Sequence, residues 1–332
     1  MKFGFLLPTC MEGLNQPPAT IRPADILRIA REAEALGLDS LWANDHLAPW
    51  PKLRQQDPRP YAWYEILVTT AWCASVTTRI KLGLGVIVVP FRDPLLLAKQ
   101  LATLDALSGG RVLFGVGIGT VRDEFEILQP RQKKASRGAM LDESLEILAL
   151  LLGQPEATFS GEHYAFEKIA LDPKPVQKPF PLYISGHVSE TLHRVATWAT
   201  GLMVMGCLPA ALRTRLDALA AEMEKAGRKM SELDVALSLA VSIEPTHERA
   251  VERFRNSQVG RRLLGRLELD QVVKGHLIGT PDEVAERITA LGEAGMTHTA
   301  PQHIAADRFE EMVEQMHRYA EDVVPRCRGS AR

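Results

Sequence analysis

The chain has 332 residues, of which 46% are hydrophobic and 24% are charged, and its formal net charge is -2. This composition is typical of a folded globular protein and excludes a strongly basic nucleic-acid-binding protein. No segment reaches the roughly 18 uninterrupted apolar residues of a membrane-spanning helix. We therefore expect neither nucleic acid nor a membrane as a partner.

The cysteines and histidines do not follow a metal-binding or disulfide pattern. Cys10, Cys73, Cys207 and Cys327 are scattered without CxxC spacing, and the nine histidines contain no HxxxH or HExxH arrangement. Zinc sites and disulfide frameworks need such clusters, so we expect no metal and reduced thiols. The N-terminal segment lacks the apolar region and cleavage site of a signal peptide. Together these features predict a cytoplasmic protein.

Short apolar runs recur along the whole chain and predict eight β-strands. Several are apolar at consecutive positions, which is typical of parallel strands covered on both faces. The runs are residues 2–8, 39–45, 80–89, 111–119, 181–186, 201–206, 235–243 and 297–304.

The segments between these runs have the apolar spacing of amphipathic helices, and most end at a glycine. In the last of them Thr280 is expected as the N-cap, with Pro281 at the first helical position and Glu283 completing a capping box. The clearest predicted helices are residues 23–37, 94–110, 140–153, 189–201 and 279–295.

Alternating strands and helices predict an α/β fold, a (β/α)8 TIM barrel formed by a single domain over residues 1–332, with a doubly wound open sheet as the alternative. Three intervals are expected to be insertions. Residues 120–136 follow the fourth strand. Residues 153–180 precede the fifth strand and contain a predicted hairpin at "TFSGEHYAF". Residues 244–279 follow the seventh strand, with a short helix and a basic turn, "GRRLLGR".

Asp45 and His46 directly follow the second predicted strand, and Trp50 lies four residues further on. Active sites of (β/α)8 barrels lie at the carboxyl ends of the strands. A carboxylate beside an imidazole can hold one tautomer and raise the imidazole pKa, which makes a proton carrier, and Trp50 would supply a flat wall. In the alternative interpretation Asp45 caps the next turn and His46 packs against Trp50.

Three alternating glycines, Gly115, Gly117 and Gly119, lie on the fourth strand. They do not form a Rossmann fingerprint, because they occupy the strand itself and Thr120 stands where the last glycine belongs. They can leave space for a flat ring at the barrel mouth. Alternatively, they allow a neighbouring backbone to pack closely.

The fifth predicted strand ends at Gly186, and His187 and Val188 connect it to a predicted helix that begins near Ser189. Free amides at a helix start form an anion site, so a phosphate is expected here. Capping of the helix by Ser189 is the alternative explanation of the same residues.

Four segments, in this order and spacing, resemble the bacterial luciferase-like superfamily, particularly its coenzyme F420-dependent oxidoreductases. The similarity extends over nearly the whole chain. The segments are "GLDSLWANDHLAPW" (37–50), "TTRIKLGLGVIVVPFRDPLLLAKQLATLDALSGGRVLFGVGIG" (77–119), "PLYISGHVSETLHRVA" (181–196) and "IGTPDEVAERI" (278–288).

The resemblance implies that a flavin-like ring lies across the strand ends and that its phosphate-bearing tail runs outward. It also implies a bulge in the third strand, commonly with a non-prolyl cis peptide, at Gly85 and Val86. Gly186, His187 and Val188 match the phosphate turn of the superfamily.

The stretch "NDHLAPW" is similar to that of F420-dependent sugar-phosphate dehydrogenases. The similarity implies that His46 transfers a proton, that Asp45 contacts the cofactor and that Trp50 is an active-site aromatic residue. Those dehydrogenases have a Glu directly after the glycine of the fourth strand, where this chain has Thr120. Asp123 and Glu124 lie nearby but out of register. Either one of them replaces the missing acid for a different substrate, or both belong only to the loop.

These residues predict an oxidoreductase that transfers a hydride between coenzyme F420 and a small organic substrate. One alternative is a monooxygenase that uses reduced FMN and O2. The other is a flavin- or deazaflavin-binding protein without turnover. The resemblance also implies a homodimer.

Overall fold

The computed structural model describes residues 1–10, 12–17 and 19–329. Eight parallel strands form a closed barrel in which β9 pairs with both β8 and β11. This arrangement confirms the predicted (β/α)8 barrel and its eight strands, and excludes the open sheet. In barrel order the strands are β9 (Asp234–Ile243), β11 (His298–Ile304), β1 (Lys2–Leu6), β2 (Ser40–Ala43), β3 (Lys81–Val88), β4 (Val112–Gly117), β7 (Leu182–Ser185) and β8 (Gly201–Met205).

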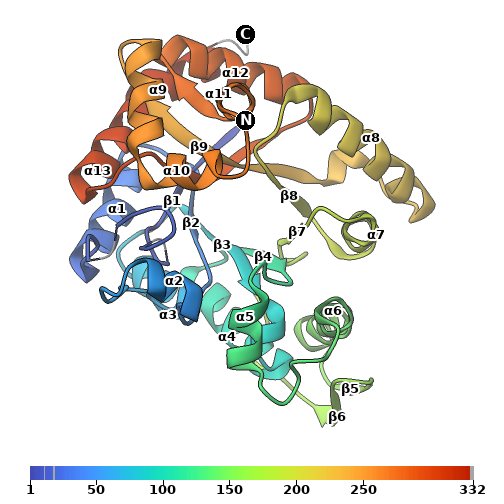
Figure 1. The fold of residues 1–332 in the computed structure, drawn as a ribbon. Coiled ribbons are helices and arrows are strands. Elements are labelled where there is room, and N and C mark those ends of the chain that lie inside the picture. Colours follow the sequence, from blue (N-terminus) through green and yellow to red (C-terminus); the bar gives the residue numbers. More distant parts are fainter. Residues whose placement is uncertain (11, 18, 330–332) are drawn as a thin grey trace.

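Helices surround the barrel (Figure 1), and the five that we predicted are confirmed. The capping box at Thr280 is also present, since its hydroxyl accepts from the Glu283 amide and the Glu283 carboxylate accepts from the Thr280 amide. No helix among the described residues is long and apolar enough to cross a membrane. The main helices are α1 (Pro23–Ala35), α3 (Ile66–Ala74), α4 (Pro94–Ser108), α6 (Arg137–Gly153), α7 (Ser189–Trp198), α8 (Pro209–Lys225), α12 (Pro281–Glu293) and α13 (Phe309–His317).

Shorter elements complete the chain. Those outside the insertions are α2 (Pro51–Gln56), the 3₁₀ helices η1 (Val89–Phe91) and η2 (Met230–Glu232), and, after α13, the π-helical η3 (Arg318–Val323) and α14 (Val324–Gly329). The first insertion contains α5 (Arg122–Leu128), and the second contains the antiparallel hairpin of β5 (Ala157–Ser160) and β6 (Ala165–Ile169), which confirms the predicted hairpin. In Figure 1 this hairpin lies beside α6, away from the barrel strands.

The third insertion is more regular than its sequence indicated. It folds into α9 (His247–Asn256), α10 (Gln258–Leu264), α11 (Leu269–Gly275) and a short strand, β10 (Leu277–Gly279), which pairs with β9. The predicted basic turn is therefore wrong, because most of "GRRLLGR" belongs to α10. The reason is a local cap: the Ser257 hydroxyl accepts from the Gly260 amide 3.1 Å away and starts the helix.

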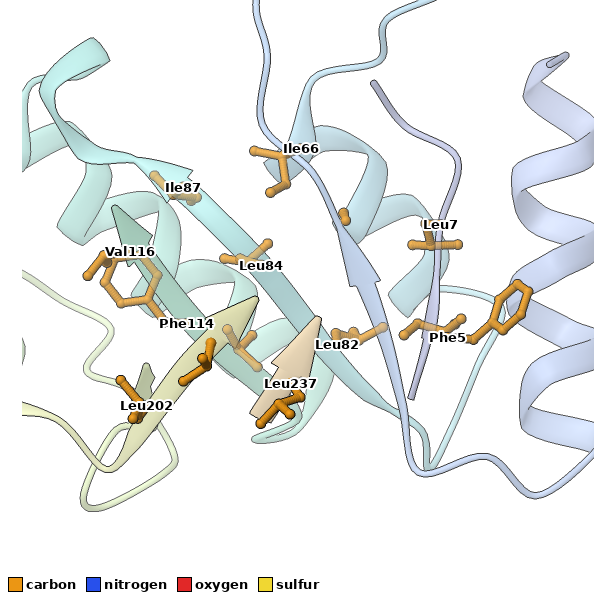
Figure 2. Packing of buried hydrophobic residues seen from close by; sticks show 14 of the residues in the cluster. Phe5, Leu7, Ile66, Leu82, Leu84, Ile87, Phe114, Val116, Leu202 and Leu237 are labelled. Atoms are coloured by element: carbon orange, nitrogen blue, oxygen red, sulfur yellow. The ribbon is translucent and has the colours of Figure 1, made fainter. Parts of the chain in front are cut away.

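The main core lies between the barrel and the helices. Alternate residues of each strand point outward, so Leu82 and Leu84 of β3 pack beside Phe114 and Val116 of β4 in this layer, part of which is shown in Figure 2. Burying such side chains contributes about 25 cal/mol per Å² of apolar surface, which makes this layer the main source of stability.

The residues that point inward fill the barrel below its mouth. Trp42 is fully buried there, with its ring edge-to-face against Tyr183 at 5.5 Å and its Nε1 donating to Ser40 Oγ at 2.8 Å. A Cβ atom at Gly83 would lie 2.2 Å from the Trp42 ring, so this position requires glycine. The interior is thus a packed core, and the space for a ligand lies above it, at the carboxyl ends of the strands.

Candidate active site

A cavity of about 630 Å³ opens at the carboxyl ends of the barrel strands. This volume is within the usual range of small-molecule sites, about 300 to 1,000 Å³. Every residue that we predicted for the site borders the cavity except Trp50, which contacts His46 instead. The residues that line the cavity run from Asn44 to His303, so the structure brings together residues that are spread over more than half of the sequence.

His46 and Glu124 form a hydrogen-bonded pair at this cavity. Nδ1 of His46 lies 2.7 Å from Oε2 of Glu124, whose side chain is only 1% exposed. The other carboxylate oxygen of Glu124 accepts from the Leu47 amide at 2.8 Å. A carboxylate accepts hydrogen bonds, so it favours the imidazole tautomer with its proton on Nδ1. Nε2 makes no hydrogen bond to a described residue and is available for a ligand.

Glu124 belongs to α5, in the insertion after β4. Its neighbour Asp123 is exposed on the same short helix, and Thr120 is exposed as well. Of the two acids that the sequence offered, Glu124 is the one that reaches the imidazole.

Asp45 does not contact the imidazole, and our expectation that it holds the His46 tautomer is wrong. Its carboxylate is fully buried and receives two hydrogen bonds from Arg92, at 2.6 and 2.7 Å, and one from the Val88 amide at 2.8 Å. Successive residues of an extended segment point in opposite directions, so Asp45 turns toward β3 while His46 turns toward α5. Burial raises the pKa of the Asp45 carboxyl, and the Arg92 guanidinium works in the opposite direction.

Aromatic rings enclose the outer side of His46. The centroid of the Trp50 ring lies 5.8 Å from that of His46, and Trp63 lies closer, at 5.3 Å. The two indole rings are themselves 6.2 Å apart. The packing of His46 against Trp50 was one of our two interpretations, and it occurs together with the Glu124 pair.

The third strand has the bulge that the resemblance implied. The peptide bond between Gly85 and Val86 is cis, and the pairing of β3 with β4 shifts register between Leu84 and Ile87. Both Gly85 and Val86 border the cavity.

The glycines of the fourth strand make room for this bulge. A Cβ atom at Gly115 would lie 2.4 Å from the Leu84 carbonyl oxygen, and one at Gly117 would lie 3.0 Å from the Val86 side chain. Close backbone packing therefore explains Gly115. Gly117 and Gly119 also border the cavity and contribute an open floor without side chains.

The turn between β7 and α7 presents free backbone amides. The amides of Gly186, His187 and Val188 donate no hydrogen bond to a described backbone carbonyl. The alternative explanation, capping by Ser189, is wrong: α7 begins at Ser189, Val188 is the N-cap, and no side chain caps the helix. Burial, with a smaller contribution from Arg215, lowers the pKa of His187. The turn has the geometry of an anion site.

Several site residues were not predicted. Trp63 and Arg92 complete the surroundings of His46 and Asp45, and Ser238 and Arg262 line another part of the cavity. Ser238 faces inward on β9, and this orientation follows from the alternation of strand residues. Arg262 had no usable signal, because it lies in "GRRLLGR", the segment of the third insertion that we interpreted as a turn. Among the described residues no group of three or more His, Cys, Asp or Glu side chains is placed to hold a metal ion.

Comparison with known proteins gives consistent results. The sequence profile of the luciferase-like monooxygenase family matches residues 1–298. An F420-dependent glucose-6-phosphate dehydrogenase of Beutenbergia cavernae is 28% identical over 330 residues, which cover 93% of this chain and 95% of that protein. The enzyme of the same name from Amycolatopsis mediterranei is 27% identical over 92% of this chain and 95% of its own length.

Solved structures support the same fold. An F420-dependent secondary alcohol dehydrogenase in complex with an F420-acetone adduct superposes with a TM-score of 0.79, at 21% identity and 98% coverage of both chains. A monooxygenase from Streptomyces bottropensis superposes with a TM-score of 0.80, at 24% identity, with 98% of this chain and 99% of that chain covered. The resemblance that we drew from the four sequence segments is confirmed. The chain belongs to the luciferase-like monooxygenase family.

Proposed function

We propose that this protein is an F420-dependent oxidoreductase that transfers a hydride between the cofactor and a small organic substrate. The observation that carries the proposal is the His46–Glu124 pair at the cavity, with Nε2 of His46 free to exchange a proton with a ligand. The names of the two dehydrogenases described above support F420 as the cofactor. The His46–Glu124 pair and the F420-dependent relatives together favour an enzyme that transfers a proton and a hydride in one reaction.

The cavity fits a flat ring with a phosphate-bearing tail. The floor at Gly85, Val86, Gly117 and Gly119, which we call the glycine floor, offers backbone and small side chains to a ring face. The free amides after β7 suit the phosphate. When bound, F420 supplies the carbon that accepts or gives the hydride. For Asp45 we propose a positioning role, because its oxygens hold Arg92 and the Val88 amide at the end of β3. Its direct contact with the cofactor stays a prediction.

The proton chemistry is assigned to His46. With Nδ1–H held by Glu124, Nε2 takes the proton of a substrate hydroxyl during oxidation, and gives a proton to a carbonyl oxygen in the reverse direction. The buried carboxylate stabilises the imidazolium that forms. Trp50 and Trp63 restrict the approach of water to the ring.

A monooxygenase that uses reduced FMN and O2 is the second candidate, and membership of the family favours it. A binding protein without turnover is the third. The three differ in what they bind and consume, so one set of measurements separates them.

The test is to titrate the purified protein with F420 and with FMN, to follow binding by fluorescence, and to assay turnover on a panel of alcohols and aldehydes. We expect F420 to bind, and His46→Ala to lower kcat by about 10² to 10⁴ while the Kd of F420 changes little. The matched control is His193→Ala, on the exposed face of α7. Oxygenation of a substrate that requires both reduced FMN and O2 would favour the monooxygenase, and turnover that is insensitive to His46→Ala would exclude the proton role.

We also propose that the protein forms a homodimer through α3 and α4. Val68 and Trp72 are exposed four residues apart on α3, and Leu96 and Leu107 are exposed on one face of α4; the exposed fractions of Val68 and Leu107 are 70% and 76%. Large apolar side chains gathered on two packed helices indicate a protein contact. Light scattering should give twice the chain mass, and Trp72→Glu should give the monomer.

The four cysteines are free, which supports a reducing, cytoplasmic location.

A further inference from the structure

The part of the cavity wall formed by β9, β11 and α10 offers hydrogen-bond donors to a ligand. It consists of Ser238 on β9, His303 on β11, Arg262 on α10 and Arg266 just after that helix, and we call it the donor wall. In the barrel order, β9 and β11 are separated from β3 and β4 by two strands on either side. The donor wall thus stands across the mouth from the glycine floor. It is also distinct from the turn after β7.

A directed chain of hydrogen bonds ends at Ser238. The amide nitrogen of Asn15 lies 2.7 Å from Nδ1 of His303, and an amide nitrogen can only donate. In this orientation of the Asn15 amide the proton of the neutral imidazole is on Nε2, which donates to Ser238 Oγ at 3.0 Å. Burial, assisted by the nearby Arg262 charge, lowers the pKa of His303 to about 3 and keeps the ring neutral. The Ser238 hydroxyl proton is left without an acceptor among the described residues.

Arg262 adds a charge to the same wall. Its guanidinium borders the cavity and makes no hydrogen bond or ion pair with a described residue. Burial, with a smaller contribution from Arg266, lowers its pKa to about 10, so it remains charged near neutral pH. A largely buried, unpaired guanidinium is costly, and such groups are normally paired with a carboxylate or another anion.

No acid of the cavity supplies that anion. The two carboxylates that border the cavity belong to Asp45 and Glu124. The Asp45 carboxylate is bound by Arg92 and the Val88 amide. The Glu124 carboxylate is bound by His46 and the Leu47 amide. By contrast, Arg261, the neighbour of Arg262 on α10, pairs with Asp307 outside the cavity.

We propose that the donor wall binds an anionic oxygen group of the substrate, a carboxylate or a phosphate ester, between Arg262 and the Ser238 hydroxyl. Arg262 supplies the charge and two parallel N–H donors, and Ser238 supplies an O–H donor whose direction is fixed by His303. A substrate anchored at this wall reaches across the mouth toward the glycine floor. This inference rests on the proposed function, and it names the class of substrate that the same site accepts.

The test uses two probes, inorganic phosphate and succinate, titrated calorimetrically into the full-length protein without cofactor. We expect saturable binding of at least one probe that depends on Arg262. Inorganic phosphate can also bind to the free amides after β7, so the Arg262-dependent binding is what distinguishes phosphate esters from carboxylates. Arg262→Gln should weaken that binding about tenfold or more, and Ser238→Ala about threefold, since charge-assisted hydrogen bonds are the stronger ones. Arg262→Lys keeps the charge but loses the two parallel donors, so it should weaken the binding less than Arg262→Gln does. The matched control Arg261→Gln should leave the binding unchanged. Circular dichroism of each variant verifies folding.

Equal affinity in Arg262→Gln and the wild type, or no saturable binding of either probe, would overturn the inference. Neither result depends on the cofactor. If the protein turns over F420 but binds neither probe, this inference fails and the proposed function stands. If it binds a probe in an Arg262-dependent way but does not bind F420, the proposed function fails and the anion site stands.

Discussion

Nδ1 of His46 lies 2.7 Å from Oε2 of Glu124, although 78 residues separate them in the sequence. The contact joins the end of β2 to α5, a helix in the insertion after β4. It holds Nδ1 of His46 against a buried carboxylate and leaves Nε2 without a hydrogen-bond partner among the described residues. An insertion outside the regular barrel thereby completes the proposed proton-transfer group.

Replacing Glu124 with Gln should reduce turnover more than binding. An amide keeps the size of the side chain but loses the charge that stabilises the imidazolium, so kcat should fall by about ten- to a hundredfold. The Kd of F420 should stay within about twofold, because Glu124 contacts His46 rather than the glycine floor. Steady-state kinetics and cofactor titration measure both quantities. Asp123→Asn, on the exposed side of the same helix, is the control and should behave as the wild type.

Breaking the pair of Arg92 and Asp45 should destabilise the fold. Both side chains are largely buried, so Arg92→Gln leaves the Asp45 carboxylate without its counter-charge, which costs about 3 to 5 kcal/mol. Denaturant unfolding measures the loss, and the double variant with Asp45→Asn should recover part of it. Lys274→Gln removes an exposed pair with Asp270 and should have almost no effect. If Arg92→Gln and Lys274→Gln lower the free energy of unfolding by similar amounts, burial does not determine the contribution of these ion pairs.

Gly83→Ala should be destabilising because Trp42 occupies the space that a methyl group needs. The added Cβ would lie 2.2 Å from the indole ring inside a packed barrel, and overpacking of this kind costs about 1 to 3 kcal/mol. Thermal unfolding followed by circular dichroism gives the change. Gly153→Ala is a matched substitution with no heavy atom within 4 Å of the new Cβ, and it should be neutral or stabilising. An unchanged melting temperature for Gly83→Ala would mean that Trp42 is loosely packed.

His276 should make the fold sensitive to acid. The ring is buried and accepts the Ala240 amide at 3.0 Å, and burial, with Arg287 nearby, lowers its pKa to about 4. The unfolded chain takes up a proton below about pH 6.5, whereas the folded protein resists it until about pH 4, so stability falls as pH decreases across that window. Between pH 7 and pH 5 the loss should be about 2 kcal/mol.

Urea unfolding at these two pH values checks this expectation. His276→Gln keeps an acceptor but cannot take up a proton in this range, so its loss should be smaller than that of the wild type by about the same 2 kcal/mol. His303 is present in both the wild type and His276→Gln, and because its pKa is also lowered, it reduces the stability of both proteins equally as pH falls. If both proteins lose equal stability, the pH dependence comes from other groups.

Most of the barrel could be predicted from the sequence because its elements have strong local signals. Consecutive apolar residues marked the parallel strands, and Thr280, Pro281 and Glu283 marked a helix start that the structure reproduces. The helices of the third insertion had weaker signals. α10 has seven residues with glycines at or near both ends, and it is stabilised by packing of Val259 into a small core with Phe254 and Val272.

The candidate site was predictable only in part. The position of His46 at a strand end follows from local sequence, but the identity of its partner depends on a contact across 78 residues. Adjacency in sequence pointed to Asp45, whereas the alternation of an extended chain separates the two side chains. The bulge at Gly85 and Val86 came from the resemblance alone, since no local pattern of this chain indicates a cis peptide.

The mouth of the cavity is formed partly by the barrel strands and partly by the third insertion. This division affects how the protein can evolve. The glycine floor is built into β3 and β4, where a substitution disturbs the packing of the whole barrel. Arg262 belongs to α10, whose residues lie outside the barrel wall. Replacing the third insertion with that of a relative would change which substrates bind and would leave the glycine floor and His46 in place. Substrate specificity is therefore the property that evolves most readily in this architecture.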